Sequence, residues 1–256
     1  MAVENGEWIM RGLSWNDPYR IRSWRELVNW VQEVGFLPLF ANEIEGFSAE
    51  EHVSPDFWWT GDAEQDPWVW RELIAANRQV AYGKFFNKKA GFISPAWLPY
   101  FANYRRDGYD FDARWEDGLL SRREKKLLDL VTERDPEGDV LWTGEPMLST
   151  EMKKQAGFGK EGDKNFPGTV TNLQMQLYLV IAGFRRRVNK RGEEYGMPVS
   201  LLVPPETLWG YETVTAAYEE TPGQSWQRIH DRILQQFPGA SEQAVGKVIG
   251  SRPSGR

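Results

Sequence analysis

The chain has 256 residues, of which 41% are hydrophobic and 27% are charged, and it contains no cysteine. These values exclude wholesale disorder, disulfides, thiolate metal sites and cysteine nucleophiles. The net charge of −6 argues against a protein that coats nucleic acid indiscriminately, but residues 151–191 carry nine Lys or Arg against three acids.

Helix signals are clear in the first half of the chain. Ser23, followed three residues later by Glu26, forms a capping-box pattern before an apolar face, and Gly35 can end the helix that follows. Asp66 and Pro67 mark the start of a second helix, since Asp caps helices and Pro suits their first turn. We therefore expect two short helices before residue 80.

The next segments have a different character. Residues 82–93 are rich in aromatic residues and predict extended chain. Residues 103–118 are polar and punctuated by glycine, which predicts a functional or connecting loop. Ser121 then caps a further helix over residues 122–134.

The pattern after Pro136 is typical of a winged helix. A short strand, VLWT, is followed by a helix that Ser149 or Thr150 caps, and a second helix is expected over about 164–177. Two extended runs, YLVIAGFRRRV and MPVSLLVPP, flank the turn NKRGEEYG. Two helices followed by a hairpin with a basic tip predict a winged helix.

The fold class is therefore expected to be mainly α with small β-hairpins, arranged as winged-helix modules in tandem. We expect an aromatic-rich region over 1–120, a winged-helix module over 121–205 and a helical extension over 206–256 that packs against that module. No apolar run reaches membrane-spanning length and no signal-peptide pattern opens the chain, so we expect a cytoplasmic protein without a membrane partner.

The strongest candidate site is a group of basic and amide side chains in this module. A phosphate backbone favours such clustering because each neutralised phosphate releases counterions. Amide side chains can in addition pair with adenine edges. The alternatives are a solvated basic face and ordinary polar residues at a helix end. The candidates are Lys153, Lys154, Lys160, Lys164, Asn172, Gln174, Arg185, Arg186, Arg187, Lys190 and Arg191.

Aromatic residues of the first half form a second candidate site. Trp58, Trp59 and Trp70, in a group with Phe57 and Trp68 and together with Arg71 and the lysines of YGKFFNKK, could stack unpaired bases between rings and cations. The competing interpretation, which the usual role of tryptophan favours, is that these rings belong to the core.

Carboxylates gather at Asp110 and Asp112, and paired acids can perform general acid–base chemistry. The alternative is a solvated or salt-bridged loop, because Arg105, Arg106 and Arg114 lie close in sequence. The two histidines have no partner at metal-ligand spacing, and no dinucleotide or phosphate-loop motif is present, so neither a metal nor a cofactor is expected.

LSTEMKKQAGFGKEGDKNF, the basic hairpin and VPPETLWG resemble the winged-helix segment of the AlkZ-type DNA glycosylases over about residues 148–209. GFLPLF, DPWVWRE, YGKFFNKKAGFIS and NYRRDGYDFDARWEDG are similar to a bacterial AlkZ-related family without an assigned activity, over most of the chain. The glycosylases excise alkylated or crosslinked bases with an early Gln-x-Gln or Gln-x-Asp motif. Here the most similar place holds Leu37, Pro38 and Leu39, so the resemblance implies the architecture without that motif.

Three hypotheses follow. The first is a repair-associated winged-helix protein that binds double-stranded DNA and need not be an enzyme. The second is a diverged glycosylase or other hydrolase whose site combines Trp58, Trp59, Trp70, Arg105, Asp110 and Asp112. The third is a protein-interaction module, because fold does not imply function.

Overall fold

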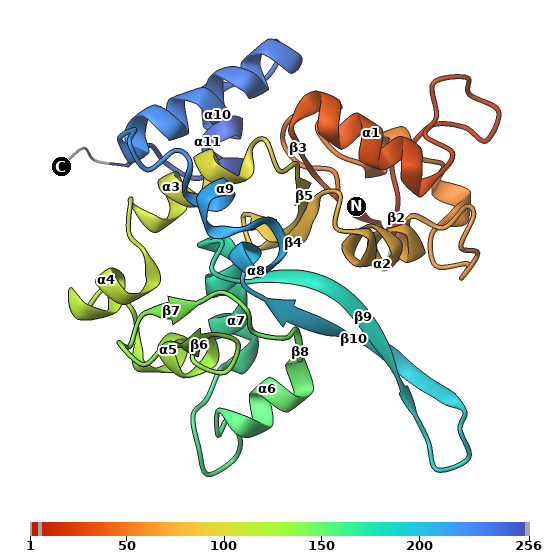
Figure 1. The fold of residues 1–256 in the computed structure, drawn as a ribbon. Coiled ribbons are helices and arrows are strands. Elements are labelled where there is room, and N and C mark those ends of the chain that lie inside the picture. Colours follow the sequence, from red (N-terminus) through yellow and green to blue (C-terminus); the bar gives the residue numbers. More distant parts are fainter. Residues whose placement is uncertain (1, 5–6, 254–256) are drawn as a thin grey trace.

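The computed structural model describes residues 2–4 and 7–253 of the chain (Figure 1). Helices hold 41% of the residues and strands 17%, which confirms a mainly helical chain with small antiparallel sheets. The first of these sheets is a short hairpin of β1 (Ala2–Glu4) and β2 (Glu7–Ile9).

The first half of the chain builds a three-stranded sheet with helices around it. Its strands lie in the order β3-β5-β4, so the third strand in sequence lies between the first and the second. The elements are α1 (Trp24–Val34), β3 (Phe36–Pro38), the 3-10 turns η1 (Glu50–His52) and η2 (Pro55–Phe57), α2 (Pro67–Asn77), β4 (Ala81–Phe86), β5 (Lys89–Ile93) and α3 (Leu98–Arg106).

The predicted helix ends of this half are largely confirmed. Ser23 accepts a hydrogen bond from the Glu26 N–H, Gly35 ends α1 with φ 101°, and Asp66 caps α2 ahead of Pro67. The Glu26 carboxylate accepts from the Arg22 N–H instead of the Ser23 N–H, so only half of the expected capping box forms.

The middle of the chain builds a second three-stranded sheet, in the order β8-β10-β9. As in the first sheet, the third strand in sequence lies between the first and the second. The order of elements along the chain, a helix, a short strand, helical segments and a hairpin, is also the same in the two halves. The elements are α4 (Phe111–Glu116), α5 (Arg122–Leu128), β6 (Glu133–Arg134), β7 (Val140–Leu141), β8 (Met147–Leu148), α6 (Ser149–Gln155), α7 (Phe166–Met175), β9 (Val180–Val188) and β10 (Glu194–Val203).

Three local expectations for these residues are wrong. The segment 103–118 is not a loop, because it holds the end of α3 and all of α4. Neither Ser149 nor Thr150 caps α6, since the helix begins at Ser149 itself and Leu148 precedes it. Ser121 does cap α5 with a full capping box, but that helix ends at Leu128.

The C-terminal segment folds into α8 (Pro205–Trp209), α9 (Tyr211–Thr215), α10 (Pro222–Gln236) and α11 (Glu242–Ile249). It was expected to pack against the middle module, and this is wrong for its long helix. Helix α10 lies against α3, and α11 contacts β4, so both cover the first half (Figure 1). Trp226 and Ile229 of α10 are buried in the same hydrophobic core as Phe101 of α3.

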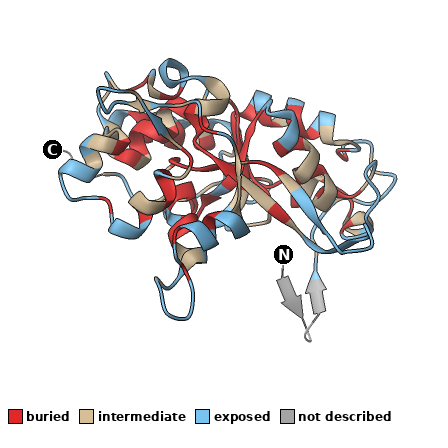
Figure 2. Ribbon diagram, turned by 60° about the horizontal axis from the view of Figure 1, so that its bottom comes forward, coloured by how far each residue is buried: buried red, intermediate tan, exposed pale blue. Residues whose placement is uncertain are grey.

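The buried residues form two cores, which lie through the middle of the molecule (Figure 2). The larger joins α1 to α3, the first sheet and the C-terminal helices, and the smaller joins α4 to α7 with the second sheet. Arg106 of α3 connects them, because its guanidinium lies 4.5 Å from the ring centroid of Tyr178 in the smaller core and donates to the Tyr218 hydroxyl and the Leu177 carbonyl of the larger core. It also donates to the Glu206 carboxylate. Burial alone would lower the pKa of Arg106, but the Glu206 carboxylate together with the hydroxyl groups of Tyr218 and Tyr178 outweighs it, and the pKa is raised.

Candidate nucleic-acid interface

The β9–β10 hairpin extends from the second core into solvent as a narrow ribbon, which we call the wing (residues 184–199) (Figure 1). The side chains of Arg185, Arg186 and Arg187 are all exposed because the strand has left the core at Phe184. Arg186 forms one weak ion pair, with Glu194 at 3.4 Å, between two side chains that are 46% and 65% exposed. The wing therefore presents cations that are mostly free to meet a polyanion.

The wing also exposes apolar side chains. Val188, Tyr195 and Met197 are 58%, 51% and 66% exposed. In the turn beyond them the Asn189 carboxamide oxygen accepts hydrogen bonds from the N–H groups of Arg191 and Glu193. An ordered ribbon with both cations and exposed apolar groups is suited to contact with a partner.

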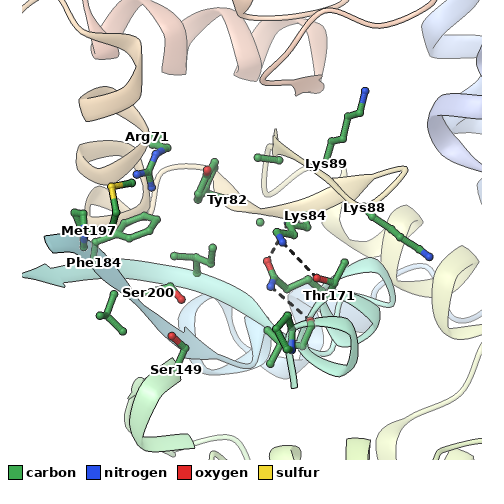
Figure 3. A pocket seen from close by; sticks show the side chains of 18 of the residues that line it. Arg71, Tyr82, Lys84, Lys88, Lys89, Ser149, Thr171, Phe184, Met197 and Ser200 are labelled. Atoms are coloured by element: carbon green, nitrogen blue, oxygen red, sulfur yellow. Dashed lines mark hydrogen bonds between the residues drawn. The ribbon is translucent and has the colours of Figure 1, made fainter. Parts of the chain in front are cut away.

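A cleft of about 700 Å³ lies between the base of the wing and the first sheet (Figure 3). Strands β4 and β5 and helix α2 line one side, and α7, the start of α6 and the wing line the other. Every charged side chain among the described residues that line the cleft is a cation. These are Arg71, Lys84, Lys88, Lys89 and Arg187.

Arg71 occupies one end of the cleft and is held between two rings. Its guanidinium carbon lies 3.8 Å from the Trp68 ring centroid and 4.4 Å from that of Phe184, and the side chain is only 4% exposed. Glu72 forms an ion pair with it at 3.2 Å. Burial raises the pKa of the neighbouring Tyr82 hydroxyl, which stays neutral and leaves the positive charge of Arg71 in place.

The two sides of the cleft are joined by Gln174. Its side chain is buried, and its Oε1 accepts from the Lys84 N–H at 2.9 Å (Figure 3). The Lys84 ammonium lies 3.4 Å from the Thr171 hydroxyl of the same helix. Gln174 therefore holds β4 to α7. Its carboxamide oxygen bonds to the backbone of β4 and is not free to pair with a base.

The remaining predicted cations lie around the helical part of the module. Lys153, Lys154 and Lys160 are exposed on or just after α6. The Lys164 ammonium donates to the Gly159 and Lys160 carbonyls, so it caps this loop. On α7 only Pro167 and Asn172 are exposed, because the other faces pack on the cleft and the core.

The three tryptophans proposed for stacking differ in exposure. Trp70 has no exposed surface and Trp58 is 6% exposed, so both rings belong to the first core. Trp59 is 48% exposed and lies outside the residues that line the cleft. Of the other residues in the group proposed for stacking, Trp68, Arg71 and the lysines of YGKFFNKK do line it. Sequence reasoning missed Phe184 and Met197, and the signal available was their position beside the arginine run.

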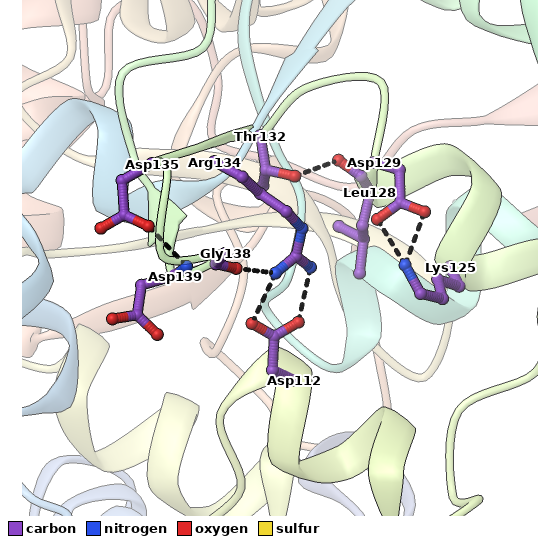
Figure 4. Close-up of polar contacts among 9 residues, drawn as sticks. All are labelled: Asp112, Lys125, Leu128, Asp129, Thr132, Arg134, Asp135, Gly138 and Asp139. Atoms are coloured by element: carbon purple, nitrogen blue, oxygen red, sulfur yellow. Dashed lines mark hydrogen bonds and ion pairs between the residues drawn. The ribbon is translucent and has the colours of Figure 1, made fainter.

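The carboxylates lie elsewhere. Asp112 accepts two hydrogen bonds from the Arg134 guanidinium, as Figure 4 shows, and Asp110 accepts from the Tyr211 hydroxyl at 2.7 Å. Burial and this hydrogen bond raise the pKa of Tyr211. The two acids line a separate cavity of about 390 Å³ with Trp142, and none of the proposed stacking tryptophans lines it. The group expected for a hydrolase is therefore not brought together.

Two further observations concern the described part of the chain. It holds no group of three or more His, Asp or Glu residues placed to bind a metal ion. None of its helices is long and apolar enough to cross a membrane.

The structure thus defines a two-core, mainly helical protein with a cationic cleft at the base of an exposed basic hairpin. A family model described as AlkZ related matches residues 21–250, and the chain belongs to this family. No curated protein and no solved structure matches it significantly.

Proposed function

We propose that this AlkZ-related protein binds double-stranded DNA through the wing, and that the cations of the cleft at the base of the wing attract the DNA to this face. The observation that carries the proposal is the cleft itself. It joins the wing to the aromatic half of the chain, and the charged side chains that line it are all cations. The chain is acidic overall, so this concentration of positive charge is local and would direct a polyanion to one face.

The topology supports a winged-helix assignment. Helix α5, strand β8, helices α6 and α7 and the β9–β10 hairpin follow in sequence, with the sheet in the order β8-β10-β9. The first half repeats this pattern with α1, β3, α2 and the β4–β5 hairpin, in the order β3-β5-β4. We therefore assign the chain as two winged helices in tandem, with 3-10 turns in place of the middle helix of the first.

Which element contacts the DNA can be inferred from which elements are exposed. In helix-turn-helix proteins the second helix enters the major groove, but α7 has little free surface here. The wing is exposed on both strands from Arg185 to Met197. We propose that the wing makes the main duplex contact, with Lys153 and Lys154 of α6 as flanking phosphate contacts.

Base excision at the glycosylase motif is not part of this proposal. The most similar place is strand β3, where Leu37 and Leu39 have no exposed surface and pack in the first core. These side chains carry no proton to transfer and no group to hold a water molecule. The proposed activity is therefore binding, in a repair context that the family relationship suggests.

The test is a titration of a fluorescent 20-base-pair duplex at two salt concentrations. Reversal of Arg185, Arg186 and Arg187 to Glu should lower the slope of log affinity against log salt by roughly 2.7, because each lost phosphate contact removes about 0.9. The control is reversal of Arg25, Lys247 and Arg252, which are exposed elsewhere and change the net charge equally.

Weakened binding by the wing variant with little effect of the control variant would support the proposal. Absence of binding at low salt, or equal losses in the two variants, would overturn it. Equal losses would show that net charge, and not the wing, controls the association.

A further inference from the structure

We propose that the cleft accepts one unpaired nucleotide from the DNA that the wing binds, so that the preferred substrate is a duplex with an unpaired base. This inference rests on the proposed function. It adds a second ligand site, formed by the facing sides of the two sheets, to the exposed surface of the wing.

The size of the cleft points to a single nucleotide. About 700 Å³ is within the range of pockets that bury a small ligand, roughly 300–1,000 Å³. A length of duplex is far larger than such a pocket. The occupant that the wing could deliver is therefore one nucleotide that has left the base stack.

The residues that line the cleft provide positive charge for a phosphate and apolar surface for a base. The exposed ammonium-bearing residues Lys88 and Lys89 lie at the mouth on the β4–β5 turn, where phosphates can meet them (Figure 3). The rings of Phe166 and Phe184 and the side chain of Val170 line the interior and offer apolar surface to a base. No carboxylate is among the described residues that line the cleft, so a phosphate meets no like charge there.

The connection to the wing is direct. Arg187 belongs both to the exposed arginine run and to the residues that line the cleft. A nucleotide displaced from a duplex on the wing would therefore enter the cleft without leaving the cationic surface. Arg71, held between Trp68 and Phe184 and paired with Glu72, lies at one end of the cleft.

The experiment compares a matched 20-base-pair duplex with the same duplex carrying a single-nucleotide bulge. The bulged duplex should bind about 5-fold to 150-fold more tightly, since stacking one base on aromatic side chains has an effect of this size. Free dAMP at millimolar concentration should occupy the cleft and remove this preference, because it carries the same base and phosphate groups as a nucleotide displaced from DNA. Binding of the matched duplex, which uses the wing, should remain.

Two variants fill the cleft without changing charge. Thr150→Trp at the start of α6 and Ser200→Trp on β10, both on the side of the cleft opposite the first sheet, should abolish the preference for the bulge and retain matched-duplex binding, which also reports that they are folded. Thr150→Val and Ser200→Ala are the matched controls and should keep the preference.

Equal binding of bulged and matched duplexes by the wild-type protein, or a preference that survives both filling variants, would overturn this inference alone. Failure to bind any duplex would instead overturn the proposed function.

Discussion

The β4–β5 and β9–β10 hairpins occupy equivalent positions in their three-stranded sheets but differ in burial. The β4–β5 hairpin is buried along most of its length, with Phe85, Phe86 and Phe92 at most 2% exposed. The β9–β10 hairpin begins in the core at Val180, is exposed from Arg185 to Met197, and returns to the core at Val199. One hairpin is part of a core, whereas much of the other is exposed to solvent.

Side-chain size and charge explain the difference. The first hairpin carries four aromatic rings and two glycines, and a Cβ at Gly91 would lie 2.7 Å from the Leu37 carbonyl oxygen, so the strands pack closely. Its turn is tight, with Asn87 and Lys88 both at positive φ. The second hairpin carries three consecutive arginines, whose burial without partners would be costly.

The largest expected effect comes from Arg106, which joins the cores of the two hairpins. Arg106→Leu leaves the Glu206 carboxylate buried without its partner, and should lower the free energy of unfolding by about 3–5 kcal/mol. Urea denaturation measures this. The double variant Arg106→Leu/Glu206→Leu should recover much of the loss, and a single variant that costs less than about 1 kcal/mol would show that the connection is dispensable.

Truncation of one ring from each hairpin tests the comparison itself. Phe86→Ala removes a buried ring and should cost about 3–5 kcal/mol in the free energy of unfolding. Tyr195→Ala, on the wing, should change it by no more than about 0.5 kcal/mol. Similar losses in the two variants would mean that both hairpins are structural.

A smaller effect is expected from Gly91→Ala, because the added methyl group would overlap the Phe86 ring and the Leu37 carbonyl. Overpacking of this kind costs about 1–3 kcal/mol, and thermal denaturation should show it. Gly159→Ala is the control, since a Cβ there would meet nothing within 4 Å. A neutral Gly91→Ala would contradict the close packing of β3 and β5.

Much of the fold could be predicted from sequence where the signals are local. Asp66 with Pro67, Ser121 with Glu124, and the apolar-to-basic change at Phe184 lie within a few residues of the ends that they determine. The segment 103–118 was mistaken for a loop because Asn103 and Arg106 are polar. Asn103 is buried against Ser225 and Arg106 against Glu206, which no local pattern reveals.

The cleft was only partly predictable for the same reason. Its lysines stood out in YGKFFNKK, but the opposite side comes from residues more than 60 positions later in the sequence. Gln174 looked like a base-reading amide, and its burial follows from the contact of α7 with β4. Residues paired across such distances can be found from the structure but not from periodicity.

The most direct test of the central claim is contact between the wing and DNA. A photoreactive benzoylphenylalanine at position 195, in place of the exposed Tyr195, should crosslink to duplex DNA on irradiation at low salt. The same residue at position 115, in place of the exposed Trp115, is the control and should not. Crosslinking from 195 alone would support the wing as the DNA-binding element, whereas no crosslink from 195, or equal yields at both positions, would contradict it.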